Sequence, residues 1–470
     1  MSAPHMLGLV EAAEAIARRE ITAMGLLEAS LARLDAVNPT LNVEIWRDAE
    51  GARRAAEAAD TALANGAALG RLHGVPLAHK DMYYQAGKPA TCGSAIRRDF
   101  VPDYTATVIE RLTEAGAYSF AGLNMAEFAQ NPTGHNKAFG DCHNPWNPPY
   151  ITGGSSSGTG AAVAALVTAG SLASYTGGSI RLPASACGVT GVKPTQTRVS
   201  RYGVMPLSFS ADNVGPLARS ARDCARLLSV IAGHDSRDPT SAREPVPDYE
   251  SALNGDLRGQ RIGVPTNAFT VGADAPVLAA MEAALQVLEA RGAQIIRLKL
   301  PLMEAINAYN AVVARVEAAT VHAEWMRSQP QSYAQHLSGR IYPGFAIPGP
   351  YYVEALAKRG PLLRAFCREV FAKVDILATP TIPTCLPTLA ETDIDHGPPG
   401  TERRFMAVSV NTRPFNYLGL PASSQPCGFD PNGLPIGLQL VARPFAEARL
   451  LQVADAYQRE TEWHRARPEV

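Results

Sequence analysis

The sequence predicts an α/β fold on three observations. Alanine is abundant and aromatic residues make up only 7% of the chain, which is typical of a helix-rich α/β protein. Short apolar runs bounded by turn residues alternate with longer segments of helical periodicity. Two strand-like runs flank a helix-like segment within residues 261–298, which is the order of a βαβ unit. The length of 470 residues allows two or three domains, but also one large α/β domain.

Composition narrows the classes of function. The formal net charge is −1 and there is no basic stripe, so we expect neither nucleic acid nor an anionic membrane as a partner. The N-terminus lacks a basic segment followed by an apolar one, and no window offers the roughly 20 apolar residues of a membrane span. The seven cysteines are odd in number and form no Cys-x-x-Cys motif. These features predict a cytoplasmic protein with reduced thiols.

The N-terminal part reads as helices. Residues 7–18 and 23–37 have amphipathic periodicity, and Asn38-Pro39 is expected to end the second helix. Residues 42–46 form a short strand candidate, and residues 48–65 form an Ala-Arg-Glu helix.

The next segment brings polar residues to strand ends. Residues 74–81 read as a short buried strand ending on Lys80. The loop after it offers Tyr83 and Tyr84 as pocket walls, with ordinary packing as their competing role. A helix over 105–115 and a strand over 117–123 follow. Gln130 lies just beyond that strand, where open α/β sheets place ligands, and local hydrogen bonding is its competing role.

Residues 151–183 form the most informative stretch. It contains two Gly-Gly-Ser turns around a small, apolar segment, residues 159–170, that suits a fully buried helix. Glycines let the backbone of such turns approach a ligand closely. The second turn, Thr176-Gly177-Gly178-Ser179, places bare N–H groups before a serine, as an oxyanion hole requires.

The rest of the chain is expected to add strands to the sheet and helices around it. We expect strands at 188–194, 199–204, 375–378 and 436–441, a turn at 212–216, and helices at 220–232, 352–373 and 446–462. Residues 301–338 read as mostly helical, and five apolar or aromatic residues after them are candidates for a substrate cover or for plain packing: Tyr342, Phe345, Ile347, Tyr351 and Tyr352. A flexible loop near the site is expected at 397–403.

A serine hydroxyl needs a base to act as a nucleophile. The stretch 151–183 holds no histidine, so a Ser-His-Asp triad has no local support. Lys80 is a suitable base, because a lysine at the end of an apolar strand is desolvated and its pKa falls. Cys92 and Cys187 are possible nucleophiles by residue type only, since neither has a base close in sequence.

The motifs GVPLAHKD, ITGGSSSGTGAA and YTGGSIRLPASACGVTGVKPT together resemble the amidase signature family of serine hydrolases. The similarity extends weakly over nearly the whole chain. It implies one amidase domain over residues 1–470 with a mixed, twisted sheet covered by helices on both faces. N-terminal helices (1–65), a signature core (about 70–220) and a variable, substrate-shaping region (about 300–410) would make up this domain.

The resemblance also implies the roles of site residues. Ser179 corresponds to the nucleophile, Ser155 to the bridging serine on a cis peptide, and Lys80 to the base. The N–H groups of Thr176, Gly177, Gly178 and Ser179 correspond to the oxyanion hole. Ser156 corresponds to the supporting serine.

Two positions depart from the family pattern. Ser157 stands where the family usually has glycine, and Tyr175 stands where it usually has aspartate. A large ring just before the oxyanion turn changes the hydrogen bonding of that loop. Tyr175, with Tyr83 and Gln130, is a tentative substrate-binding residue.

The resemblance implies an amidase that cleaves a C–N bond of small amides, with aryl amides, anilides or carbamates (urethanase activity) as candidates. No cofactor or metal is expected, the partner is a small amide or carbamate substrate, and a homodimer is compatible with the family. The alternative is the A subunit of a glutamine-dependent tRNA amidotransferase, which shares the same triad and passes ammonia to a partner. A glycine-rich phosphate binder fits less well, because GGSSSGTG lacks the Lys-Ser/Thr ending of a P-loop.

Overall fold

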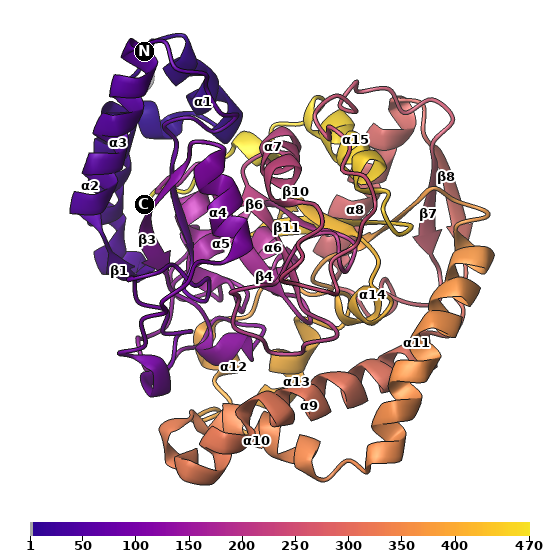
Figure 1. Ribbon diagram of the computed structural model, residues 1–470. Coiled ribbons are helices and arrows are strands. Elements are labelled where there is room, and N and C mark those ends of the chain that lie inside the picture. Colours follow the sequence, from indigo (N-terminus) through magenta and orange to yellow (C-terminus); the bar gives the residue numbers. More distant parts are fainter. Residues whose placement is uncertain (1–2) are drawn as a thin grey trace.

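The computed structural model describes residues 3–470 and confirms the α/β fold with a mixed sheet (Figure 1). A small sheet has the strand order β1-β3-β2, and a large one has the order β4-β6-β5-β10-β11-β9-β7-β8. The strands are β1 (Glu44–Arg47), β2 (Pro76–Lys80), β3 (Tyr118–Leu123), β4 (Gly170–Tyr175), β5 (Thr190–Lys193), β6 (Asn213–Ala218), β7 (Arg261–Pro265), β8 (Gln294–Leu298), β9 (Ile376–Pro380), β10 (Ala422–Phe429) and β11 (Pro435–Ala442).

Strand direction changes within both sheets. In the large sheet β4 to β9 pair antiparallel along the order above, whereas β9-β7 and β7-β8 are parallel. In the small sheet β2-β3 is parallel and β1-β3 antiparallel. The βαβ unit expected at 261–298 is confirmed as β7, α8 (Ala275–Ala290) and β8.

Side chains connect the two sheets where β2 lies beside β4. Ser171 Oγ donates to the Ala78 carbonyl at 2.6 Å, and the Leu172 N–H donates to His79 Nδ1 at 3.1 Å. The pKa of the fully buried His79 is lowered to about 3 by burial, so the ring is neutral and can accept this bond. This junction places the last residue of β2, Lys80, next to the end of β4.

Helices cover both faces of the large sheet. α5 (Ser157–Ala164) and α6 (Arg181–Cys187) pack on one face, and α7 (Ala221–Ile231), α8 and α15 (Glu447–Gln458) contact the sheet and one another on the other. Every residue of α5 is buried, which agrees with its small side chains. The N-terminal helices α1 (Leu9–Ala17), α2 (Ala23–Leu41) and α3 (Ala49–Ala64) lie on the side of the small sheet (Figure 1).

A helical arm extends from the sheet region (Figure 1). It consists of α9 (Met303–Ser328), α10 (Gln335–Phe345) and α11 (Gly349–Val370), and α9 packs against α10, α11 and α14 (Arg413–Tyr417). The remaining α-helices are α4 (Thr107–Glu114), α12 (Leu389–Thr392) and α13 (Thr401–Ala407). The loop expected at 397–403 is therefore partly helical. Within residues 3–470, no helix is both long enough and apolar enough to cross a bilayer.

Three local expectations were wrong. α2 continues through Pro39 and ends at Asn42, which is left-handed with φ of 50°. A proline one turn from the end of a helix removes a single hydrogen bond, so the last turn survives. Residues 212–216 were expected as a turn but begin β6, in which a Cβ on Gly215 would lie 2.1 Å from the Val192 carbonyl oxygen. That glycine permits close strand contact rather than a turn. Residues 199–204 form only isolated bridges.

Candidate active site

Lys80 lies at the carboxyl end of β2 with its side chain 1% exposed. Its Nζ is 2.7 Å from Ser155 Oγ and 2.8 Å from Ser174 Oγ. Burial lowers the pKa of Lys80 to about 7, and the Asp212 carboxylate opposes part of that shift. A large fraction of the lysine is therefore a neutral amine near pH 7, with a lone pair available to accept a proton.

Ser155 follows a cis peptide bond between Gly154 and Ser155. The Gly154 N–H donates to the Pro132 carbonyl at 2.6 Å, and the Ser155 carbonyl accepts from the Ala126 N–H at 3.0 Å. A Cβ on Gly154 would lie 2.5 Å from the Asn131 carbonyl oxygen, so only glycine fits before this serine. These contacts fix the Ser155 backbone while its hydroxyl meets Lys80.

Three successive carbonyl groups of the loop 176–179 accept hydrogen bonds from other parts of the chain. The Thr176 carbonyl accepts from Asn416 Nδ2, the Gly177 carbonyl from Thr412 Oγ1 at 2.6 Å, and the Gly178 carbonyl from the Leu182 N–H at 2.8 Å.

In a trans peptide the carbonyl and the following N–H point in opposite directions. The N–H groups of Gly177, Gly178 and Ser179 consequently point away from those partners. Within residues 3–470 none of the three donates to a protein acceptor. Such a set of free donors can stabilise an oxyanion.

Ser179 lies on the wall of a cavity of about 360 Å³, called here the front cavity. Gly177, Gly178 and Gln130 line it too, and the buried Nε2 of Gln130 is unpartnered among the described residues. The expectation that Gln130 is a pocket residue agrees with this position. The structure thus brings Lys80 and Ser155 into contact, and places Ser179 and the turn before it on an accessible cavity.

Ser156 and Ser157 begin α5 next to the bridging serine. Ser156 Oγ makes only a long bond, 3.5 Å, to the Ser174 carbonyl. Ser157 Oγ is buried without a partner among residues 3–470. The serine at 157 therefore fits the space of the usual glycine without forming a new hydrogen bond.

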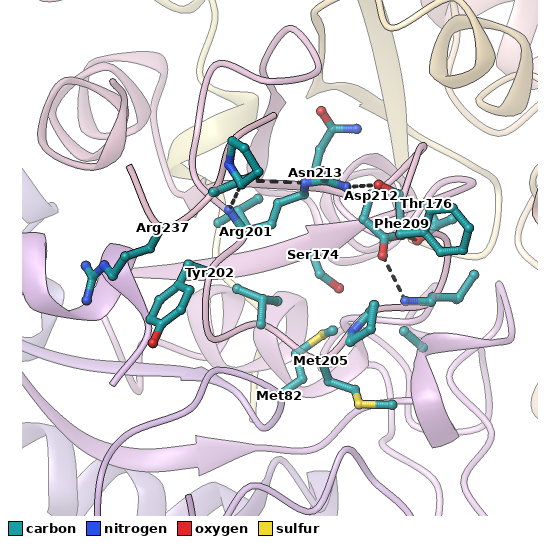
Figure 2. Close-up of a pocket in the computed structure, with 17 residues that line it drawn as sticks. Met82, Ser174, Thr176, Arg201, Tyr202, Met205, Phe209, Asp212, Asn213 and Arg237 are labelled. Carbon is teal, nitrogen blue, oxygen red and sulfur yellow. Dashed lines mark hydrogen bonds and ion pairs between the residues drawn. The ribbon is translucent and has the colours of Figure 1, made fainter. Parts of the chain in front are cut away.

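A second cavity of about 270 Å³, called here the rear cavity, shares Thr176 with the front cavity (Figure 2). Ser174, Thr176 and Asp212 line it together with the apolar side chains of Met82 and Met205 (Figure 2). Ser174, the second partner of Lys80, and Asp212, which binds Thr176 Oγ1, were both missed in the sequence reasoning. Neither residue belongs to one of the sequence motifs. The packing of β2 beside β4 brings Ser174 to Lys80, and the pairing of β4 with β6 brings Asp212, just before β6, to the same end of β4.

Two tentative substrate-binding residues lie elsewhere. Tyr83 is 2% exposed, packs edge-on to His79 and lines neither cavity. Tyr175, the last residue of β4, is fully buried. Its hydroxyl donates to the Thr412 carbonyl at 2.9 Å and accepts from Arg181 Nη2. Both tyrosines therefore lie outside the two cavities, and their contact with substrate stays a prediction.

The aromatic cover expected from residues 342–352 is also absent from the two cavities. None of its five candidate residues lines either one. Tyr342, Phe345 and Tyr351 are instead 49%, 49% and 59% exposed on the helical arm. The arm contributes polar and charged residues to the front cavity, among them Asn310, Arg315 and Arg340.

Asp212→Asn is expected to move the acidic limb of the pH–rate profile to lower pH. Asp212 has a pKa raised to about 6 by burial, so it is mostly ionised near pH 7 and raises the pKa of Lys80. Removing that charge lets the lysine lose its proton at lower pH. The measurement is kcat/KM against pH for wild type and variant, and a limb that stays in place or moves upward would contradict this coupling.

Tyr175→Phe is expected to lower the free energy of unfolding by about 1–3 kcal/mol, because the Thr412 carbonyl and the Arg181 guanidinium each lose one buried hydrogen bond and keep only their other ones, including the 2.8 Å bond between them. Urea denaturation measures the change. Tyr342→Phe, at a half-exposed position, is the control and should fall within about 0.5 kcal/mol of wild type. Equal stability of both variants would show that the Tyr175 hydroxyl has no bracing role.

The cysteines do not form a rival site. Burial raises the pKa of Cys92 to about 12 and raises that of Cys187 as well. A thiol held in its protonated form is a poor nucleophile. Within residues 3–470 no three His, Cys, Asp or Glu side chains gather in a way that could hold a metal ion.

Known proteins resemble the chain over its whole length. The A subunit of glutamyl-tRNA(Gln) amidotransferase from Chloroflexus aurantiacus is 41% identical, with 100% of this chain and 99% of that protein covered. Among solved structures, one described as a vestigial protein complex bearing on the origins of an s-triazine catabolic enzyme has a TM-score of 0.91 at 32% identity, covering 99% of this chain and 100% of the other. The A subunit of the amidotransferase from Thermotoga maritima has a TM-score of 0.82 at 29% identity, covering 98% and 96%.

These relatives correct the expectation about partners. We expected a small-molecule substrate and no nucleic acid, but full-length relatives carry the name of one component of a glutamyl-tRNA(Gln) amidotransferase. The expectation rested on the near-neutral charge of this chain. The net charge of one chain does not indicate whether other subunits of an assembly bind nucleic acid.

The family itself follows from a match that covers most of the chain. The family model for amidases aligns with residues 25–451, a range that includes β2, the cis bond, the loop 176–179 and the first turn of α15. An amidase of known crystal structure shares the fold, with a TM-score of 0.84 at 31% identity. The chain belongs to the amidase signature family.

Proposed function

We propose that this chain hydrolyses an amide C–N bond through Ser179 and does so as the A subunit of a tRNA amidotransferase, with glutamine as the amide donor. Two observations support hydrolysis by Ser179: Lys80 Nζ lies 2.7 Å from Ser155 Oγ, and the lowered pKa of Lys80 leaves much of this amine neutral near pH 7. The identity of 41% over the full length of an amidotransferase A subunit supports the setting.

The proton path starts at Ser179. Its hydroxyl proton passes to Ser155 Oγ while the Ser155 proton passes to Lys80 Nζ, and Ser179 Oγ forms a bond to the amide carbonyl carbon. The carbonyl oxygen becomes negative and accepts from the N–H groups of Gly177, Gly178 and Ser179. Lys80 is then a cation and Ser155 is neutral again.

Collapse of this intermediate breaks the C–N bond. The nitrogen takes a proton from Ser155, which recovers one from Lys80, and ammonia or an amine leaves. Water then attacks the acyl-Ser179 ester by the same proton path in reverse, which releases the carboxylic acid and restores the serine. The contact between Lys80 and Ser155 and the N–H groups of residues 177–179, unpartnered among residues 3–470, support this scheme.

To test the proposed subunit role, the isolated chain is compared with the chain in its native extract. We expect partner subunits to co-purify with a tagged chain, and glutamine hydrolysis to rise at least tenfold when partners and glutamyl-tRNA(Gln) are present. Full glutaminase activity of the isolated chain, with no co-purifying partner and no response to the tRNA, would contradict the subunit role.

A second candidate is hydrolysis of small amides by the chain without a tRNA, including aryl amides, anilides and carbamates. The TM-score of 0.91 to the s-triazine-related structure, against 0.82 to the A subunit from Thermotoga maritima, favours it. A panel of aryl amide, carbamate, ester and small aliphatic amide substrates tests this candidate. Turnover of one of these by the isolated chain at a rate above that of glutamine would favour it over the first.

A further inference from the structure

A turn with two left-handed residues lies beside the active site. Glu127–Ala129 form a single 3-10 turn in which Phe128 has φ of 46° and Ala129 has φ of 60°. Residues other than glycine rarely adopt this conformation, so contacts with the surroundings must hold the turn. Ala129 lines both cavities, and the next residue, Gln130, lines the front cavity. The turn is therefore a constrained element next to the site.

Backbone hydrogen bonds connect this turn to both members of the proton relay. The residue before the turn, Ala126, donates from its N–H to the Ser155 carbonyl at 3.0 Å. The Phe128 N–H donates to the Cys92 carbonyl at 2.9 Å. The Cys92 N–H in turn donates at 2.9 Å to the carbonyl of Asp81, the residue that directly follows the lysine base. A shift of the turn would therefore be transmitted to the backbone beside both relay residues.

The helical arm packs against the turn through a cluster of rings. The Phe128 ring stacks on Trp325 of α9, with centroids 5.2 Å apart, and lies edge-on to His322 of α9 at 4.6 Å. Tyr333, between α9 and α10, is the third ring around Phe128, at 5.8 Å, and its hydroxyl is 2.9 Å from His322 Nδ1. Such ring pairs add specific geometry to the area that they bury. The arm thus fixes the direction in which the Phe128 side chain leaves the turn.

The Glu127 carboxylate makes a second connection to the arm. Glu127 is 2% exposed and accepts from Ser94 Oγ at 2.7 Å and from the Ala334 N–H at 3.2 Å. Ala334 directly precedes α10, so this hydrogen bond ends on the arm. A buried carboxylate is costly unless its oxygens accept hydrogen bonds. Loss of either donor is therefore expected to displace the turn.

A small displacement matters at the relay. Lys80 Nζ and Ser155 Oγ are 2.7 Å apart, and proton transfer requires hydrogen-bond reach. A misplacement of about 1 Å caused by a distant change can cost roughly 100-fold in rate. Because the Ser155 carbonyl is held by Ala126, movement of the turn changes the position of the bridging hydroxyl.

We propose that Glu127 and Phe128 are positioning residues through which the helical arm holds Ser155 in the relay to Lys80. The arm then sets the reactivity of the nucleophile and does more than enclose the substrate. The inference rests on the proposed hydrolysis at Ser179 and names what regulates that site: the contact between the arm and the turn Glu127–Ala129.

The test uses an alkyl fluorophosphonate, which reports on the nucleophile without an amide substrate. Ser179 Oγ forms a bond to phosphorus, fluoride leaves, and the serine proton passes through Ser155 to Lys80. The second-order rate constant is measured for the full chain with any subunits that co-purify. Glu127→Ala is expected to lower it roughly 100-fold, and Glu127→Gln about tenfold because glutamine keeps one acceptor oxygen.

Ala334→Pro tests the arm without altering a side chain of the turn. Ala334 has φ of −59° and the preceding Tyr333 has ψ of 150°, so proline fits this backbone and removes only the N–H that binds Glu127. We expect phosphonylation to slow about tenfold. Ala334→Gly keeps the N–H and should recover most of that factor. Near-UV circular dichroism shows whether each variant is folded, and Ala334→Pro decides the question if Glu127→Ala is not.

A purely structural role would lower the stability of these variants and leave the rate constant of the folded protein unchanged. Glu324→Ala, at an exposed glutamate of α9, is the matched control and should react like wild type. Wild-type phosphonylation of folded Ala334→Pro would overturn the inference and leave hydrolysis by Ser179 intact. A wild-type chain that is not labelled at Ser179 would contradict the proposed function itself, together with the inference that depends on it.

Discussion

Replacing Ser179 by alanine is expected to lower kcat/KM for amide hydrolysis by roughly 10⁴- to 10⁶-fold, the range seen when a nucleophile is removed from a serine hydrolase. On the wall of the front cavity, Ser179 directly follows Gly177 and Gly178, whose N–H groups have no protein acceptor among residues 3–470. Without Ser179 Oγ no acyl-enzyme forms, and the remaining donors can only polarise a carbonyl for attack by water. The measurement is steady-state hydrolysis with each amide that the wild type turns over.

The control is Ser251→Ala, at an exposed serine whose hydroxyl donates to the Asp248 carbonyl. It should retain wild-type kcat/KM. Mass spectrometry of quenched reactions adds a direct readout, because the wild type should carry an acyl group on the peptide that contains Ser179. Wild-type turnover by Ser179→Ala, or an acyl group on Ser155 or a cysteine, would require another nucleophile.

The motifs that contain the candidate site residues could be located in the sequence because each is local. Lys80 ends an apolar run, and Ser155 and Ser179 each follow a Gly-Gly turn, whereas their assigned roles come from the family resemblance. The structure adds contacts between residues far apart in the sequence, which no short window contains. Asn416 and Thr412, more than 200 positions away, bind the carbonyls that turn the loop's N–H groups toward the cavity.

Contacts between distant segments also explain which parts of the site could not be predicted from the sequence. Tyr175 next to the oxyanion turn suggested a substrate contact, but residues of a strand alternate between faces, and this one points to the buried Arg181. The charged lining of the front cavity could not be predicted either, since its arginines Arg315, Arg340 and Arg413 belong to three helices that only tertiary packing brings together. Polar surroundings therefore replace the aromatic cover that local composition favoured.

Replacing Lys80 by methionine is expected to lower kcat/KM by about 10³-fold or more, because the proton of Ser179 then has no acceptor beyond Ser155. In wild type the rate should depend on the fraction of neutral lysine. Since the pKa of Lys80 is about 7, kcat/KM should rise about tenfold per unit of pH below 7 and level off above it. A flat profile from pH 5 to 9, or a limb near pH 10, would show that a neutral Lys80 is not the base.

Stability gives an independent test of the same lysine. The folded-state pKa of about 7 lies below the ordinary value of 10.5, so between these values the unfolded chain binds the proton and the folded chain does not. Stability of the wild type should therefore rise with pH from 7 to 10.5, and the penalty of protonating Lys80 in the folded state is fully present below pH 7. Lys80→Met carries no such proton. Its gain in unfolding free energy relative to wild type should be largest below pH 7 and shrink toward pH 10. A difference that stays constant over that range would mean that the buried amine keeps its ordinary pKa, and the proposed relay would then lack its base.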